Sequence, residues 1–145
     1  ESFLLDGDAF NGTSEDYING YSGQLTYLNK LMKNTIAQIL EKSESDPIII
    51  IQGDHGPGAF LKWETLDQAC FQERMGILNA YHLPGEARKQ LYSSITPVNT
   101  FRLVLNEYFD EAYPLLEDKV YFSKWSTPYE FHDVTTNAEQ CNLMN

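Results

Sequence analysis

The sequence predicts an α/β fold in which a mostly parallel sheet is flanked by helices. An amphipathic stripe over residues 17 to 43 indicates a long helix, and Pro47-Ile-Ile-Ile-Ile-Gln52 reads as a strand without polar alternation. Strands of that kind are covered on both faces, which is typical of parallel sheets. A second helix start, Thr96-Pro97, follows later in the chain. The 145 residues are enough for a single domain with its own core.

Residues 1 to 16 are rich in Gly, Asp, Ser and Asn and are expected to form a loop. From Tyr17 to Ser43, apolar residues recur at steps of three and four, so one helix face is expected to pack in the core. That face consists of Tyr21, Leu25, Leu28, Met32, Ile36, Ile39 and Leu40. Ser14 or Asp16 can cap the start of this helix.

Beyond the Pro47 strand the pattern is weaker. Residues 57 to 72 show no clean period and are expected to form a loop with a short helix near Glu64 to Cys70. Met75 to Leu83 is predicted to be a second strand, because it is apolar and stops at Pro84. Glu86 to Ser93 is expected to form a short helix.

Thr96 and Pro97 mark the clearest helix start in the chain, with Thr at the cap and Pro at the first helical position. The inner face of this helix is expected to contain Val98, Phe101, Leu105 and Phe109. Residues 119 to 123 are predicted to form a short edge strand, and residues 135 to 145 a frayed tail.

Composition excludes some classes of partner. The chain has ten Lys and Arg but 21 Asp and Glu, for a formal charge of −11. This charge disfavours binding to nucleic acid and is compatible with a local cation site. No apolar run approaches the roughly 18 residues of a membrane span. Cys70 and Cys141 lie in no metal or redox motif, and we expect buried or incidental thiols.

Asp54 and His55 are the candidate site. They lie between glycines directly after the Pro47 strand, where the backbone can approach a ligand closely. An Asp-His pair is more often a polar turn, but its oxygen and nitrogen donors suit Zn²⁺ or Mn²⁺. A metal site needs at least a third ligand, for which His82 and His132 are the remaining histidines. Arg74 and Arg102 are candidate anion-binding groups, although a structural salt bridge is the favoured role for each.

The combination of QGDHGP (residues 52 to 57), ERMGILNAYHLPG (73 to 85) and PVNTFR (97 to 102) resembles the C-terminal part of sulfatase-like proteins of the alkaline phosphatase superfamily. It is most similar to bacterial membrane proteins related to lipoteichoic acid synthases and phosphoethanolamine transferases. The resemblance runs from about Phe3 to about Thr135.

The resemblance implies that Asp54 and His55 are metal ligands in a phosphate or sulfate ester hydrolase or transferase. The Asp-His form favours the phosphoryl-transferring branch, and the metal is Mn²⁺ or Zn²⁺, with Mg²⁺ or Ca²⁺ as alternatives. The nucleophile, an acidic metal ligand and a substrate-binding histidine lie upstream in that family, and nothing here corresponds to them. We therefore expect residues 1 to 145 to be the C-terminal portion of a larger domain, inactive alone and holding metal weakly or not at all.

Further expectations concern partners and location. A phosphate or sulfate ester is the expected substrate of the parent protein, which the resemblance places at the extracytoplasmic face of the membrane, anchored by segments outside this chain. An exposed sheet edge or apolar surface would favour a homodimer. The alternative function is a non-catalytic binding or scaffold domain that keeps the fold.

Overall fold

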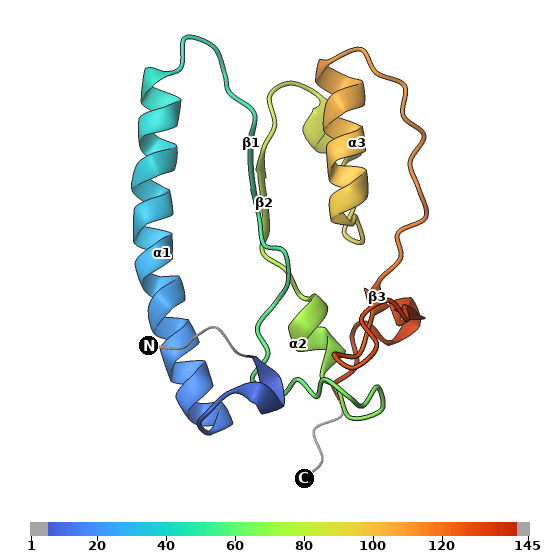
Figure 1. Ribbon diagram of the computed structural model, residues 1–145. Coiled ribbons are helices and arrows are strands. Elements are labelled where there is room, and N and C mark those ends of the chain that lie inside the picture. Colours follow the sequence, from blue (N-terminus) through green and yellow to red (C-terminus); the bar gives the residue numbers. More distant parts are fainter. Residues whose placement is uncertain (1–5, 142–145) are drawn as a thin grey trace.

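The computed structural model describes residues 6–141, and Figure 1 shows a long helix, a two-stranded ribbon and a second helix side by side. The helix α1 runs along one side of the ribbon β1–β2, and α3 lies on the other side. The elements in chain order are η1 (Gly7–Ala9), α1 (Ser14–Lys42), β1 (Ile49–Gln52), α2 (Phe71–Met75), β2 (Asn79–His82), η2 (Ala87–Gln90), α3 (Pro97–Tyr108), β3 (Tyr121–Phe122), β4 (His132–Asp133) and η3 (Thr135–Asn137).

The long helix predicted from residue 17 is confirmed, and it begins slightly earlier, at Ser14. A capping box sets this start: the Thr13 hydroxyl accepts a bond from the Asp16 amide, and the Asp16 carboxylate accepts one from the Thr13 amide. The loop predicted over residues 1 to 16 is therefore wrong for residues 14 to 16, which belong to α1. Its first five residues lie outside the described part.

The core role predicted for the α1 stripe is wrong over most of its length. Tyr17 is the buried residue of this helix, whereas Leu28, Ile39 and Leu40 are exposed. The spacing of three and four residues identified a continuous apolar face correctly. In the described structure, however, none of the seven residues of that face is buried: three are exposed and the other four are half-buried.

The strand predicted at Pro47 is confirmed as β1, and the strand predicted from Met75 as the shorter β2. They pair antiparallel, with Ile49 opposite His82 and Gln52 opposite Asn79. The second sheet, β3 with β4, is also antiparallel. Among residues 6–141 each sheet has two strands. The mostly parallel sheet thus stays a prediction, since the pairing described here does not display one.

One core cluster joins the ribbon to α3. Leu83, Ala87, Leu103 and Val104 are buried together, with Ile48, Ile50 and Tyr81 packed against them. Because side chains alternate along a strand, Ile49 and Ile51 belong to the opposite face, the side on which α1 lies (Figure 1).

The inner face predicted for α3 is wrong. Val98, Phe101, Leu105 and Phe109 are 46%, 50%, 37% and 60% exposed, and the helix buries Asn99, Thr100, Leu103 and Val104 instead. Two asparagines explain this rotation.

Asn99 and Asn106, two turns apart on α3, each exchange a pair of hydrogen bonds with the extended segment 110–118. Asn99 Nδ2 donates to the Leu116 carbonyl at 2.8 Å, and its Oδ1 accepts from the Leu116 amide at 2.9 Å. Asn106 does the same with Tyr113, at 2.8 and 2.7 Å. These bonds orient α3 so that the face with Asn99 and Asn106 lies against the segment 110–118, and the face predicted to be buried is left exposed.

A second core cluster lies around α2. Leu61, Ala69, Phe71, Phe122 and Val134 are buried together there. The helix predicted near residues 64 to 70 is displaced toward the C-terminus: α2 begins at Phe71. Ala69 and Cys70, which directly precede it, are buried but not helical. The short helix predicted over residues 86 to 93 is confirmed only in part, as the 3₁₀ turn η2, and the edge strand predicted over residues 119 to 123 is confirmed as the shorter β3.

Cys70 and Cys141 form a disulfide, so the expectation of incidental thiols is wrong. A short backbone bridge joins the same two residues, and the Gln72 amide donates to the Gln140 carbonyl at 3.0 Å. The described part of the predicted frayed tail, residues 135 to 141, is therefore tied to α2. Residues 142 to 145 lie outside the described part. The two cysteines are 71 residues apart, so local sequence could not predict that they pair. Their contact depends on the path of the chain after β3, which returns through β4.

Candidate functional site

Asp54 and His55 lie at the carboxyl end of β1, in the glycine-flanked segment that the sequence singled out. The Gly53 amide donates to the Leu78 carbonyl at 2.9 Å, which continues the β1–β2 ladder to the edge of the site. Gly56 is buried, and a Cβ there would lie 2.0 Å from the Glu73 carbonyl oxygen. Only glycine allows the loop to approach α2 this closely.

The His55 ring is oriented by a backbone carbonyl. Its Nδ1 lies 2.8 Å from the Gly56 carbonyl oxygen, which can only accept a hydrogen bond, so Nδ1 carries the proton. In the neutral imidazole the other nitrogen, Nε2, then holds a lone pair. Histidines that bind metals commonly have this arrangement, with one ring N–H donated to a carbonyl or carboxylate.

The free nitrogen faces the neighbouring carboxylate. His55 Nε2 lies 3.6 Å from Asp54 Oδ2, and the two side chains are 44% and 90% exposed. Two ligands at about 2.1 Å from a tetrahedral ion are separated by about 3.4 Å. The pair therefore fits two positions of a divalent-metal shell and leaves the remaining positions open to solvent.

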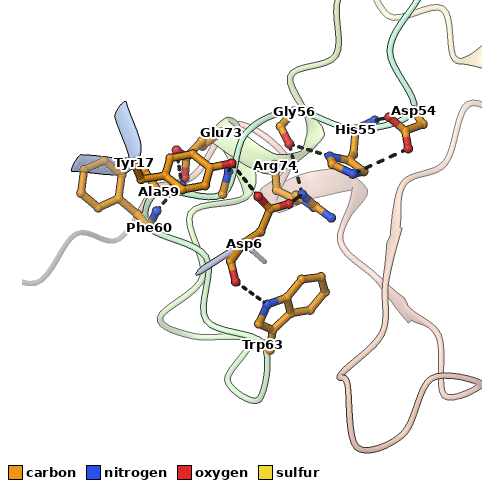
Figure 2. A network of polar contacts seen from close by, with 11 residues as sticks. Asp6, Tyr17, Asp54, His55, Gly56, Ala59, Phe60, Trp63, Glu73 and Arg74 are labelled. Atoms are coloured by element: carbon orange, nitrogen blue, oxygen red, sulfur yellow. Dashed lines mark hydrogen bonds and ion pairs between the residues drawn. The ribbon is translucent and has the colours of Figure 1, made fainter. Parts of the chain in front are cut away.

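Arg74 holds this loop from below, as Figure 2 shows. Its Nη1 donates to the Gly56 carbonyl at 3.2 Å and to Asp6 Oδ2 at 2.7 Å, and its own carbonyl accepts from the Gly56 amide at 2.7 Å. The guanidinium lies over the Trp63 ring, 5.3 Å from its centroid. The Arg74 side chain is only 12% exposed, so this ion pair is largely shielded from water.

Two further groups complete the support. The Tyr17 hydroxyl donates to Asp6 Oδ1 at 2.6 Å and accepts from the Gly58 amide at 3.1 Å. The Glu73 carboxylate accepts from the amides of Ala59 and Phe60 at 2.8 and 3.0 Å. Four side chains, those of Asp6, Tyr17, Glu73 and Arg74, thus hold residues 56 to 60 in one conformation; we call them the loop clamp.

The other two histidines lie apart from this pair. His82 is opposite Ile49, at the far end of the ladder from Gly53, and its Nε2 contacts Asp46 Oδ1 at 2.7 Å. His132 belongs to β4 in the second sheet. Across residues 6–141, no group of three or more His, Cys, Asp or Glu side chains is arranged to hold a metal. The described structure thus brings together Asp54 and His55 but neither of the suggested third ligands.

The favoured role of Arg74, a structural salt bridge, is confirmed by its contact with Asp6. Arg102 instead donates to the Pro114 carbonyl at 3.4 Å and lies over the Tyr113 ring. Sequence reasoning missed Asp6, Tyr17 and Glu73 as supports of the site. No local spacing could have found them, since the Arg74–Asp6 contact spans 68 residues.

The loop clamp predicts a change of stability at alkaline pH. Burial, and then the hydrogen bond to Asp6, raise the pKa of Tyr17 from its ordinary value of 10.0 to about 12. The neutral phenol is therefore favoured by folding, and this contribution is complete below pH 10 and lost as pH rises toward 12. We expect the free energy of unfolding to decline over that range, and Tyr17→Phe to reduce the decline. Urea unfolding at a series of pH values measures it.

Tyr129→Phe is the matched control, because the Tyr129 side chain is 90% exposed. An equal effect of the two substitutions would show that Tyr17 is not the group whose ionisation weakens the fold.

Comparisons with family models, with curated proteins and with solved structures find no match to this chain. No helix within residues 6–141 combines the length and the apolar character needed to cross a membrane.

Proposed function

We propose that this chain is part of a metal-dependent enzyme that hydrolyses phosphate or sulfate esters or transfers their phosphoryl or sulfuryl group, with phosphoryl transfer favoured. Asp54 and His55 supply two of the metal ligands. The observation that supports this most directly is the hydrogen bond from His55 Nδ1 to the Gly56 carbonyl, which in the neutral ring directs the lone pair of Nε2 toward the side of the Asp54 carboxylate. A mixed oxygen and nitrogen donor set of this kind suits Zn²⁺ or Mn²⁺.

The chemistry assigns distinct tasks to the two residues. A bound divalent ion would neutralise charge on the ester oxygens and lower the pKa of a coordinated nucleophile. Asp54 contributes a negative charge that offsets part of the charge of the ion, and His55 contributes a neutral nitrogen of fixed direction. The loop clamp keeps both at the end of β1, so little ordering remains to be done when the ion binds.

The proposal places the other ligands and the nucleophile on polypeptide outside the described residues. Apolar surface supports this, because Phe101 and Leu105 on α3, Phe109 directly after it, and Leu28 and Leu31 on α1 are all exposed. Soluble monomers rarely leave such faces uncovered. Further parts of the same domain would cover them in the parent protein, and a second copy of the chain is the other occupant that these faces would accept.

The disulfide supports an extracytoplasmic location. Disulfides persist in oxidising compartments and are rare in the reducing cytosol. Cys70 and Cys141 join α2 to the C-terminal segment, and the bond is part of the described fold.

The alternative is a binding or scaffold domain that keeps the loop without chemistry. The observation that favours it is that the described residues place two donors, and not three, at the Asp54 site. The two functions differ in whether metal is retained and whether an ester is turned over.

The test uses the protein at its full genomic length. Elemental analysis should find a divalent metal in the wild type and a loss of that metal in Asp54→Ala. Turnover of model phosphate esters should fall by at least roughly 100-fold, because removing a ligand removes the stabilisation of charge in the transition state. Parallel assays with sulfate esters distinguish the two substrate classes.

Asp46→Ala is the matched control, since Asp46 is also an exposed carboxylate beside a histidine, at the opposite end of the ribbon. Metal content and turnover should be unchanged in that variant. Retention of metal in Asp54→Ala would contradict the assignment of the ligand, and metal without turnover of either ester class would favour the binding domain.

A further inference from the structure

The Arg74 side chain joins the loop clamp to the Asp54 site at the Gly56 carbonyl oxygen. This oxygen accepts from His55 Nδ1 at 2.8 Å and from Arg74 Nη1 at 3.2 Å. A carbonyl oxygen has two lone pairs, and both are used here. The orientation of the Gly56 peptide therefore depends on Arg74, and the proton position on His55 depends on that peptide.

Arg74 also contacts the other side of the same residue. Its carbonyl accepts the Gly56 amide at 2.7 Å, so the Gly56 backbone is bonded to Arg74 through both its N–H and its C=O. These two groups belong to the peptide units on either side of the Gly56 Cα, so Arg74 constrains both units, and the carbonyl cannot turn away from His55 without losing its bond to Nη1. A free imidazole in a flexible loop could place its proton on either nitrogen, whereas this carbonyl accepts only from Nδ1.

The Arg74 side chain is itself fixed. Asp6 binds the same Nη1 at 2.7 Å, the Tyr17 hydroxyl holds Asp6 at 2.6 Å, and the Trp63 indole donates to the Asp6 carbonyl at 2.9 Å. Both members of the ion pair are mostly buried, at 12% and 20% side-chain exposure. Such a pair keeps its geometry better than an exposed one, because competing water is excluded.

We propose that Arg74 is a positioning residue that holds His55 in the tautomer with the proton on Nδ1, so that Nε2 is available to a metal ion, and that Asp6 acts through Arg74. The proposal rests on the function given above for the use of Nε2. The tautomer itself is a property of the metal-free protein. It can be measured without any activity.

The experiment is two-bond ¹H–¹⁵N NMR of the histidine rings at about pH 8.5, where histidine side chains are neutral. In the wild type, His55 should show a protonated Nδ1 and an unprotonated Nε2. In Arg74→Gln the His55 pattern should shift toward a mixture of tautomers. Asp6→Asn should cause a smaller shift in the same direction, and it supplies the test if Arg74→Gln does not fold.

Glu73→Gln is the matched control. Glu73 is the neighbour of Arg74 and bonds the same loop, but at the amides of Ala59 and Phe60 and not at the Gly56 carbonyl. It should leave the His55 tautomer unchanged. An equal shift in Glu73→Gln and Arg74→Gln would overturn the proposal, because general loosening of the loop would then explain both.

Titration with Zn²⁺ alone separates this proposal from the function on which it rests. Zn²⁺ should perturb His55 Nε2 in the wild type, and Arg74→Gln should weaken that binding about 10- to 100-fold, as loss of a partner behind a metal ligand does. An unchanged tautomer in Arg74→Gln overturns the positioning role, whatever Zn²⁺ does. A tautomer that follows Arg74, with no effect of Zn²⁺ on His55, instead overturns the metal-site function.

Discussion

Replacing both Cys70 and Cys141 by alanine should lower the free energy of unfolding by about 4 kcal/mol, the value that the loop-entropy relation gives for a bridge of this span. The bond closes a loop between residues 71 positions apart. Without it, the unfolded chain gains conformational freedom that the folded chain does not. Alanine is the suitable substitute because Cys70 is 3% exposed, and a serine hydroxyl would be buried there.

Urea unfolding measures this effect, and a reductant provides the control. A reducing agent should shift the unfolding midpoint of the wild type toward that of the double variant and leave the double variant unchanged. Equal midpoints for the oxidised wild type and the variant would show that the bridge adds nothing to stability.

The bridge should also affect the site at a distance. Cys70 directly precedes α2, and α2 carries Glu73 and Arg74, which hold the loop of Asp54 and His55. Opening the bridge releases Cys141 from Cys70 and removes one constraint on the start of α2. We therefore expect amide hydrogen exchange to increase at Gly56 and Ala59 in the reduced protein.

Asn99→Ala should destabilise the protein by roughly 3 kcal/mol, because it removes all the hydrogen bonds of a fully buried amide and leaves a cavity in its place. Asn99 is fully buried. Its Nδ2 also donates to the Tyr92 hydroxyl at 3.1 Å and to Asp118 Oδ1 at 3.0 Å, in addition to its exchange with Leu116. All of these groups lose a hydrogen bond when the amide is removed.

Asn106→Ala is the internal comparison, since Asn106 makes the same reciprocal bonds with Tyr113 nearer to solvent. Water can replace those bonds, and we expect a loss of only about 1 kcal/mol. Thermal or urea unfolding of the two variants measures the two losses of stability. If they lose the same stability, burial is not what makes the Asn99 contacts important.

Asp118 connects these contacts to the start of α3. Its carboxylate accepts from the Thr96 amide at 2.8 Å and from the Thr96 hydroxyl at 2.6 Å. Burial acts to raise the pKa of Asp118, but these bonds and that of Tyr92 outweigh it and hold the pKa below the ordinary value of 3.8. Thr96 marks the helix start, as its sequence predicted, yet the capping oxygen comes from 22 residues away.

Local sequence determined several features by itself. The β-branched run at Pro47 gave a strand, the stripe from residue 17 gave a long helix, and Thr96-Pro97 gave a second helix start, because each depends on backbone preferences of adjacent residues. The position of Asp54 and His55 at the end of a strand followed in the same way. These features require only that residues close together in the sequence favour the same backbone conformation.

Only the tertiary structure decided which surfaces are covered and what supports the site. The apolar face of α3 is exposed because Asn99 and Asn106 bind a segment that returns to the helix, and Cys141 reaches Cys70 through the pairing of β3 with β4. The proton of His55 is placed by a carbonyl that Arg74 holds, and Arg74 is held by Asp6 from 68 residues away. Contacts of such long range depend on the path of the whole chain, which no local period or spacing records.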